Sequence, residues 1–340
     1  MRSQPSGTKS GIKKIPTICN LCQADDYAQV AVGKEHEYDN TTDDTFNVVR
    51  CKKCDLIYLN PRPDVETLST IYPSNYYSYN QKALRDLANP NSILQRLRYK
   101  GFQAKVEKSL ALARQPSSSM LRILDIGCGD GHTLDLYRQQ PAVETHGVDF
   151  NQDALALARS NGHCVYAGRF EEVELPRDYF DLVTATHVIE HVPDPMEFAR
   201  KAFSVLKPGG IFWLETPNIE SLDARIFRQG NWGGYHFPRH WFFFSRKTIL
   251  QLADKIGFQT EFVDFVPNAI FWFWTMHSII LQNYPQARKF ADTIFPPIDF
   301  QKDSLSNFLR ICFFCSIDVA IKATTRETSN MIVALRKPAM

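Results

Sequence analysis

The sequence has little that would set the chain apart from ordinary globular proteins. Its formal net charge is only +2, and its 340 residues contain no uninterrupted run of 18 apolar residues. The balance of charge therefore indicates no nucleic-acid partner, and a simple membrane span is not expected. The polar stretch at residues 1–14 lacks the apolar segment of a secretory signal. With 44% hydrophobic and 22% charged residues, we expect a cytoplasmic protein with room for two domains.

The eight cysteines are too few for a disulfide scaffold in a chain of this length. Four of them form two Cys-x-x-Cys pairs, Cys19 with Cys22 and Cys51 with Cys54, separated by 28 residues. Each pair can direct two thiolates to one side of a tight turn, and two pairs complete a tetrahedral zinc site. A redox pair needs only one such motif, so two matched pairs favour structural zinc and a reducing compartment. All four ligands would be cysteine, which leaves no open position for catalysis.

A glycine-rich turn follows the apolar run at residues 121–126 and precedes a helical pattern. Glycine lets the backbone approach a ligand closely and adopt positive φ. A dinucleotide-binding fingerprint requires glycine at the sixth position counted from Gly127, but that position is His132. Asp149, 20 residues after Gly129, ends the next apolar run. A carboxylate at that place can accept the hydroxyls of an adenosine ribose, whichever cofactor carries it.

Strand-like and helix-like segments alternate from residue 119 onward, which is typical of an α/β domain with a parallel sheet and helices on both faces. We expect strands at residues 121–126, 145–149, 163–167, 180–186, 211–216, 259–265 and 331–336. About 65 residues separate the last two strands, more than a tight hairpin needs. The predicted organisation is a disordered tail (1–16), a zinc ribbon (17–60), a helical connector (61–118) and the α/β domain (119–340) with a helical insertion at about 266–328.

Several motifs together carry a family resemblance. The Gly127-x-Gly129-x-Gly131 turn, two residues after Asp125, resembles the first motif of class I S-adenosylmethionine-dependent methyltransferases. The segment from His187 through Glu190-His191 to Pro195 is similar to a signature of ubiquinone-type methyltransferases. The cysteine pairs and the following Asn-Pro-Arg-Pro and tyrosine-rich segments resemble zinc-ribbon methyltransferases associated with cell-surface glycan and O-antigen biosynthesis.

This resemblance covers residues 19–337. It implies a Rossmann-like seven-stranded methyltransferase sheet with helices on both faces, together with a small N-terminal zinc ribbon. It also implies S-adenosylmethionine as cofactor, bound by Asp125, Gly127, Cys128, Gly129, Asp149, Phe150, Arg169, Phe170, Thr186 and His187. Arg169 departs from the family pattern, where a short polar or acidic residue is usual. In some ubiquinone-type relatives an acid at the position of His187 holds a divalent ion together with the residues that match Glu190 and His191. This chain has a histidine at that position, which weakens the case for a metal ion there.

A glycine-rich stretch from Gly230 to Trp241 contains two histidines, an arginine and several aromatic residues. Such a composition does not suit a hydrophobic core and is typical of a functional site. A histidine that titrates near neutrality suits removal of a hydroxyl proton, and an arginine suits an anionic sugar or phosphate group. In order of preference, the expected base is His240, His191 or His236, with Arg239 and Glu190 as further catalytic residues. A purely structural role remains open for each histidine.

We therefore expect an S-adenosylmethionine-dependent methyltransferase that methylates a hydroxyl of a sugar or glycan intermediate of cell-surface polysaccharide. A quinone-type or other small-molecule hydroxyl is the nearest alternative. An NAD-dependent sugar oxidoreductase and a non-catalytic zinc-ribbon adaptor are alternatives of other classes. The aromatic-rich insertion has three open interpretations: helix-on-helix packing, a cap on the acceptor pocket, or peripheral contact of residues 266–325 with the inner face of a membrane near a lipid-linked acceptor.

Overall fold

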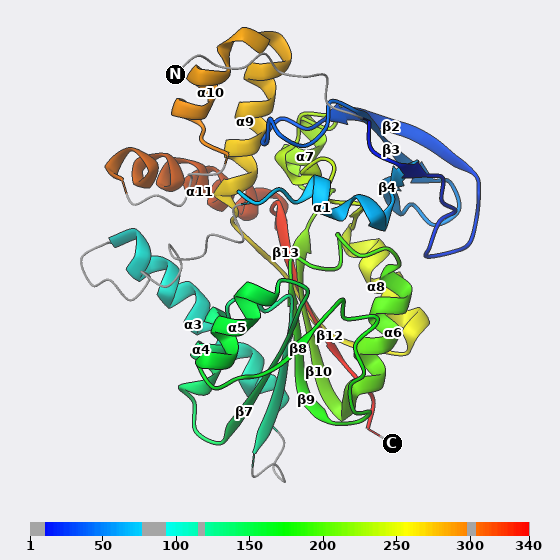
Figure 1. Ribbon diagram of the computed structural model, residues 1–340, viewed down its shortest axis with the longest axis vertical. Coiled ribbons are helices and arrows are strands. Elements are labelled where there is room, and N and C mark those ends of the chain that lie inside the picture. The colour runs from blue at the N-terminus through cyan, green and yellow to red at the C-terminus, as the bar shows by residue number, and fades with distance from the viewer. Residues whose placement is uncertain (1–10, 77–92, 115–119, 298–303, 340) are drawn as a thin grey trace.

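The computed structural model describes residues 11–76, 93–114, 120–297 and 304–339. Its centre is a seven-stranded sheet with the strand order β12-β13-β10-β9-β6-β7-β8 (Figure 1). The pairs from β10 to β8 are parallel, whereas β13 is antiparallel to both of its neighbours. This topology confirms the predicted Rossmann-like methyltransferase sheet. The strands are β6 (Leu121–Ile126), β7 (Val143–Asp149), β8 (Cys164–Ala167), β9 (Phe180–Thr186), β10 (Leu206–Pro217), β12 (Gln259–Val266) and β13 (Asn330–Arg336).

Helices cover both faces of this sheet (Figure 1). Those on one side are α3 (Ile93–Ala113), α4 (His132–Arg138) and α5 (Gln152–Ser160), and those on the other are α6 (Pro195–Val205) and α8 (Arg246–Ile256). Local signals set the ends of α8: the Ser245 side chain accepts the Thr248 backbone N–H, and Gly257 ends the helix with φ +98°.

Strand β10 begins before the predicted range of 211–216. The Lys-Pro-Gly-Gly segment forms its irregular start, with a register shift between Leu206 and Ile211.

A smaller four-stranded antiparallel sheet carries the paired cysteines. Its strands, in spatial order, are β11 (Phe242–Phe243), β4 (Ile57–Leu59), β3 (Thr45–Cys51) and β2 (Tyr27–Lys34). Strand β11 comes from the chain beyond β10, so the cysteine-bearing sheet is completed by a segment of the predicted α/β domain. The two units therefore share a sheet and pack as one body.

Residues 12–15 of the predicted tail are part of the fold. Strand β1 (Lys14–Ile15) pairs with β5 (Arg62–Pro63), and the Ile12 N–H donates to Asp44 Oδ2 at 2.8 Å. These hydrogen bonds hold in place residues whose polar composition had indicated a disordered tail. Residues 1–10 and 115–119 lie outside the described residues, as do Tyr77 and Tyr79 of the tyrosine segment that begins at Tyr72.

The insertion between β12 and β13 is helical, as predicted. It contains α9 (Ala269–Asn283), α10 (Arg288–Ile294) and α11 (Leu305–Thr325), and the short helices α1 (Leu68–Ile71) and α7 (Leu222–Ile226) lie elsewhere in the fold. Trp272 of α9 stacks on Phe314 of α11 at 5.7 Å between ring centroids, and its indole N–H donates to Asp318 at 2.8 Å. Within the described ranges, no helix is both long enough and apolar enough to cross a membrane.

We predict opposite effects of adding one methyl group at two glycines. A Cβ at Gly33 of β2 would lie 2.0 Å from Cε2 of the buried Phe237, whereas a Cβ at Gly101 of α3 would meet no atom within 4 Å. Gly33→Ala should lower the free energy of unfolding by about 1–3 kcal/mol through overpacking. Gly101→Ala should raise it by about 0.5–1 kcal/mol, because alanine is the better helix former. Urea unfolding measures both, and a Gly33→Ala protein as stable as the wild type would contradict the packing of β2 on Phe237.

Candidate functional site

A cavity of about 420 Å³ opens beyond the carboxyl ends of β6, β7 and β9. Open α/β sheets bind ligands at this edge. Eight of the ten residues predicted to bind the cofactor line it: Gly127, Gly129, Asp149, Phe150, Arg169, Phe170, Thr186 and His187. Aromatic residues from other parts of the chain complete the wall: Tyr72, Tyr76, Trp241, Phe271 and Trp274.

The glycine turn after β6 and the aspartate that ends β7 form one hydrogen-bonded unit. The Gly129 N–H donates to Asp149 Oδ2 at 2.9 Å, and the Asn151 N–H donates to Oδ1 at 2.8 Å. Gly127 has φ +73°, and a Cβ there would lie 2.8 Å from Val188, so a larger residue would be strained and crowded. Burial raises the pKa of Asp149, and the N–H donors oppose this rise. The carboxylate is held at the cavity wall with lone pairs left for ligand hydroxyls.

Asp125 and Cys128 lie behind the turn and do not line the cavity. Asp125 is buried and accepts the Thr184 hydroxyl at 2.6 Å, and burial raises the pKa of Asp125 to about 7. The Cys128 Sγ lies against Gly147, where an added Cβ would come within 2.4 Å of it. The structure therefore places both residues behind the glycine turn and not among the residues that line the cavity.

The segment that follows β8 closes one end of the cavity. Phe170 is buried there and packs edge to face on Phe198 of α6, with ring centroids 5.3 Å apart. Phe150 lies across the cavity with 53% of its surface exposed. Arg169 also lines this end, and its guanidinium lies 3.3 Å from Glu172. The two phenylalanines thus provide apolar surfaces for a flat ligand group.

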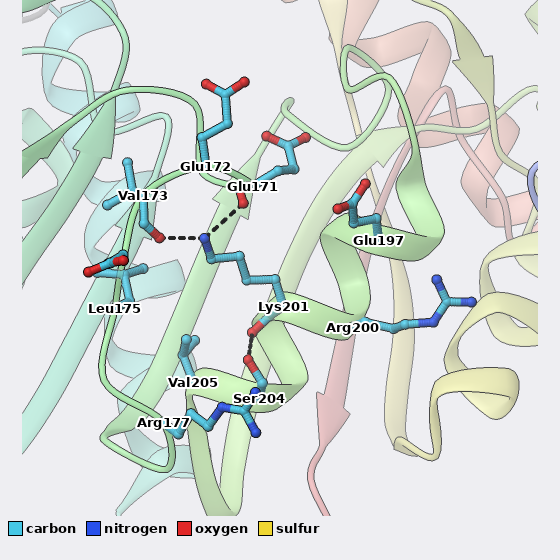
Figure 2. Close-up of a pocket in the computed structure, with 11 residues that line it drawn as sticks. Glu171, Glu172, Val173, Leu175, Arg177, Glu197, Arg200, Lys201, Ser204 and Val205 are labelled. Atoms are coloured by element: carbon cyan, nitrogen blue, oxygen red, sulfur yellow. Dashed lines mark hydrogen bonds between the residues drawn. The ribbon is translucent and has the colours of Figure 1, made fainter.

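A second, more open pocket of about 680 Å³ lies behind the same segment (Figure 2). Carboxylates and cations share its wall, and none of the residues predicted for the site lines it. Lys201 of α6 points across it and donates to the backbone carbonyl of Glu171 at 3.0 Å and to that of Val173 (Figure 2). Since both acceptors follow Phe170, this lysine fixes the segment that closes the main cavity.

His187 and Glu190 form a carboxylate–imidazole pair at the cavity wall. His187 Nδ1 lies 3.0 Å from Glu190 Oε1, and Glu190 Oε2 accepts the Thr216 hydroxyl at 3.1 Å. The Glu190 side chain is fully buried, whereas 31% of the His187 side chain is exposed. Burial lowers the pKa of His187, but the hydrogen bond and charge of Glu190 outweigh it and raise this pKa. Because Nδ1 is engaged, Nε2 is the ring nitrogen left for a ligand.

The same interactions act on the glutamate. Burial alone would raise the pKa of Glu190, yet the hydrogen bond and charge of His187, with the nearby His191 and His240, lower it to about 2. His187 also has φ +53°, a left-handed conformation that is uncommon for a residue with a side chain. Such conformations persist when the surroundings determine them, and they cluster at functional sites.

His240 and His191 line the cavity beside this pair, with ring centroids 4.6 Å apart. The carbonyl oxygen of Gly234 lies 2.8 Å from His240 Nδ1, and that of Arg239 lies 3.0 Å from His191 Nδ1. A carbonyl only accepts, so each Nδ1 carries the proton and each Nε2 is an acceptor. Burial lowers the pKa of both histidines, that of His240 well below its usual range. Donor atoms of Glu190, His191 and His240 lie within 4.8 Å of one another, so this trio could also hold a divalent ion.

Arg239 and His236, which were also predicted as catalytic residues, do not line the cavity. Arg239 Nη1 lies 2.6 Å from Glu35 Oε2 and Nη2 lies 3.4 Å from Glu37 Oε2. Arg239 Nε donates to His236 Nε2 at 2.9 Å, and His236 Nδ1 lies 2.6 Å from Glu37 Oε1. Both side chains are buried and neither lines the cavity. The guanidinium is already neutralised and both imidazole nitrogens are engaged, so neither residue can serve an acceptor.

Sequence reasoning missed several residues of the site. Glu35 and Glu37 lie between the cysteine pairs in no recognisable motif, and only the fold brings them to Arg239. Phe271 and Trp274 belong to the aromatic-rich insertion, whose role had been left open. Their apolar helical pattern could have been assigned to the cavity only by knowing that α9 lies over the sheet edge.

The four paired cysteines come together at one end of the small sheet. Their sulfur atoms lie within 4.8 Å of one another, with Cys19 and Cys54 at 3.4 Å and Cys22 and Cys51 also at 3.4 Å. Burial raises the pKa of the Cys19 and Cys54 thiols, whereas the N–H groups of Cys54 and Lys53 outweigh burial and lower the pKa of Cys51. The case for a metal therefore rests on the convergence of the four sulfur atoms and not on their pKa values. The donor set fits a tetrahedral Zn–S₄ centre.

The part of the chain that forms most of the central sheet and the cavity wall is similar in sequence to known proteins. The sequence model of a family described as a methyltransferase domain matches residues 87–261, just over half of the chain. A relative from Mycolicibacterium smegmatis, described as a probable S-adenosylmethionine-dependent methyltransferase, is 36% identical over 141 residues, or 41% of this chain and 52% of that protein. A ubiquinone biosynthesis O-methyltransferase from Shewanella sp. is 33% identical over 104 residues, or 28% of this chain and 44% of that protein. The chain thus spans about half the length of these relatives.

Two solved structures show a lower similarity. A SAM-dependent methyltransferase from Archaeoglobus fulgidus has a TM-score of 0.45 and 20% identity, covering 70% of this chain and 94% of that one. An S-adenosylmethionine-dependent methyltransferase from Mesorhizobium loti has a TM-score of 0.43 and 18% identity, covering 68% and 96%. The assignment therefore rests on the family match and on the chain's own strand order. The chain belongs to the methyltransferase-domain family.

Proposed function

We propose that the protein transfers the methyl group of S-adenosylmethionine to a hydroxyl of an uncharged sugar or glycan intermediate. The observation that carries this proposal is the Asp149 carboxylate, held by two backbone N–H groups at the mouth of the glycine turn. An acid in this place can accept both ribose hydroxyls of an adenosine. The His132 that follows the turn departs from the dinucleotide fingerprint, which argues against the NAD-dependent oxidoreductase.

The chain's own residues divide the cavity into two functional ends. Asp149 would hold the ribose, and Phe150 and Phe170 would flank the adenine. Thr186 and His187, at the end of β9, would face the methionine part of the cofactor, which supplies an electrophilic methyl group when bound. Methyl transfer is an in-line displacement, so the enzyme must align the acceptor, remove its proton and exclude water. The aromatic wall from α9 and the tyrosine segment serves the alignment and the exclusion of water.

His187 is the strongest candidate for the proton acceptor. Glu190 fixes its tautomer, raises its basicity and leaves Nε2 at the cavity wall. His240, predicted first from sequence, presents a neutral Nε2 in the same cavity, but its lowered pKa makes it the weaker base. We assign the hydroxyl proton to His187, with His240 as a hydrogen-bond partner of the acceptor.

The wall of the cavity favours an uncharged acceptor. Of the described residues that line it, Arg169 alone carries a permanent positive charge, and it lies near Glu172 at the expected adenine end. The remaining acceptor wall is largely aromatic, which suits the apolar face of a sugar ring or of a quinol. A quinone-type hydroxyl therefore stays the nearest alternative, and the name of the Shewanella relative favours it.

We also infer that Cys19, Cys22, Cys51 and Cys54 hold a structural zinc ion. The support is the convergence of four sulfur atoms where both cysteine pairs meet the small sheet. Such a centre replaces hydrophobic core in a small unit and contributes to its folding free energy.

Asp149→Asn tests the cofactor assignment. Losing the carboxylate should weaken S-adenosylmethionine binding about 10- to 100-fold in calorimetry, because each hydrogen bond to a charged group contributes about 1.5–3 kcal/mol. Asp153→Asn, an exposed acid in the first turn of α5, is the matched control and should bind as the wild type does. Tighter binding of NAD than of S-adenosylmethionine, or an unaffected Asp149→Asn protein, would count against the proposal.

Replacing His187 by glutamine should lower kcat by about 10²- to 10⁴-fold once a screen of neutral sugars and quinols has given a working acceptor. The base acts in its neutral form, so kcat/KM should rise with pH through the pKa of His187. Removing the charge of Glu190 by Glu190→Gln lowers that pKa, and the acid limb of the profile should move to lower pH. Calorimetry with S-adenosylmethionine should show near-normal binding by both variants, which separates loss of chemistry from loss of cofactor.

His240→Gln supplies the comparison, since it should reduce kcat less than His187→Gln and leave the acid limb in place. The reverse ranking would assign the base to His240. The adaptor alternative would be favoured if the wild type and both histidine variants bound S-adenosylmethionine fully but methylated no acceptor. Activity abolished by EDTA and restored by Mg²⁺ would instead indicate that Glu190, His191 and His240 hold a catalytic ion.

Metal analysis of the purified protein should find about one zinc per chain. Cys22→Ser and Cys54→Ser should each reduce this content and lower the melting temperature. Cys312→Ser, which removes an exposed cysteine that belongs to none of the metal-capable clusters of the described residues, should change neither value. Zinc-free wild-type protein with an unchanged melting temperature would refute the structural role.

A further inference from the structure

Helix α11 presents an uncharged face to solvent. Its exposed large side chains are Leu305 at 73%, Leu309 at 58%, Phe313 at 61% and Val319 at 59%. The other exposed positions between 305 and 325 are alanine, serine, threonine and Cys312. The partly exposed Arg310 and Lys322 are the charged residues beside this face: Arg310 donates to Asn307 Oδ1 at 3.0 Å, and Lys322 pairs with Asp264 at 3.0 Å. A surface helix ordinarily places charged residues on its outer side, and an apolar outer side indicates that something covers it.

The opposite face of α11 is fixed to the wall of the cleft. Phe314 stacks on Trp272 of α9, and the buried Asp318 accepts the indole N–H of the same tryptophan. Two other α9 residues, Phe271 and Trp274, line the cavity. The outer face of α11 is therefore held rigidly, one helix away from the expected acceptor.

Positive charge borders this apolar face. The first turns of α3 contain Arg96, Arg98 and Lys100 and no acid, and they expose Ile93 and Leu97 by 57% and 55%. Burial raises the pKa of Cys315 in α11, and the charge of Arg98 opposes this rise. In the view of Figure 1 the start of α3 lies just below α11.

We propose that this surface, formed by Leu305, Leu309 and Phe313 with the basic start of α3, docks on the headgroup region of an anionic lipid bilayer. Apolar side chains enter the boundary between headgroups and acyl chains, and lysine and arginine attract acidic lipids. The helix lies in the plane of the bilayer and does not cross it. A second copy of the chain suits the surface less well, because in a two-fold interface the basic residues would approach their own copies.

Docking through α11 would place α9, whose Phe271 and Trp274 line the cavity, directly behind the membrane-bound helix. The docking itself needs neither cofactor nor acceptor, so it stands or falls separately from the proposed methyl transfer.

Vesicle flotation tests the docking with the full chain. The wild type should float with phosphatidylcholine vesicles that contain phosphatidylglycerol and remain mostly unbound with pure phosphatidylcholine. Leu309→Ser combined with Phe313→Ser should reduce the partition coefficient at least about tenfold, because two exposed apolar anchors are lost. Arg96→Gln combined with Lys100→Gln should reduce the partition coefficient by a similar factor. High salt should reduce the partition coefficient of the wild type in the same way, because it screens the same charges.

Met120→Ser is the matched control, since it removes an exposed apolar side chain at the start of β6, the opposite end of the sheet from the cleft. It should float as the wild type does, and equal melting temperatures should show that all variants are folded. Absence of flotation, equal binding to neutral and anionic vesicles, or equal loss in Met120→Ser would overturn the proposal. The proposal would also be overturned if light scattering showed that the wild type is a dimer and that Leu309→Ser combined with Phe313→Ser makes it a monomer.

Discussion

The arrangement of the cleft depends on one buried cation. Arg239 forms an ion pair with Glu35 at 2.6 Å, lies 3.4 Å from Glu37 and donates to the Ile71 carbonyl at 3.0 Å, while its own carbonyl oxygen faces His191. It therefore joins the cysteine-bearing sheet, the tyrosine segment and the histidines of the cleft. Burying charge has a high desolvation cost that only paired partners offset, so the loss of one partner destabilises far more than the loss of a surface pair. The histidines keep their places only while the N-terminal unit stays docked.

This constraint gives the N-terminal unit a part in the cleft. The small sheet takes its last strand, β11, from the segment directly after His240 and Trp241. Strand β3 ends at Cys51 and pairs with β4, β4 pairs with β11, and His240 and Trp241 before β11 line the cavity. The zinc centre proposed above would act on the cavity through these strands without contacting a substrate, in the same sense that outer groups orient the ligands of a metal site.

The donor half of the site could be predicted because its signals are local. A glycine turn, an acid at the end of the next strand and the alternation of strands and helices each follow from short segments. The acceptor half could not, since its contacts join distant segments: Arg239 and Glu35 lie 204 positions apart. A sequence motif also could not show which histidine is placed to accept a proton. Their roles follow from which nitrogen is engaged, and the partners of His187, His236 and His240 are visible only in three dimensions.

The insertion begins and ends at paired positions of the sheet edge, where Val266 of β12 lies opposite Asn330 of β13. Its two ends are thus one strand spacing apart, so helices of other length or sequence could replace α9 to α11 without shifting the register of the seven strands. The glycine turn and Asp149 lie on other strands and would be untouched by such an exchange. Evolution, or a protein engineer, can therefore change the wall that α9 contributes to the cavity while keeping the glycine turn and Asp149.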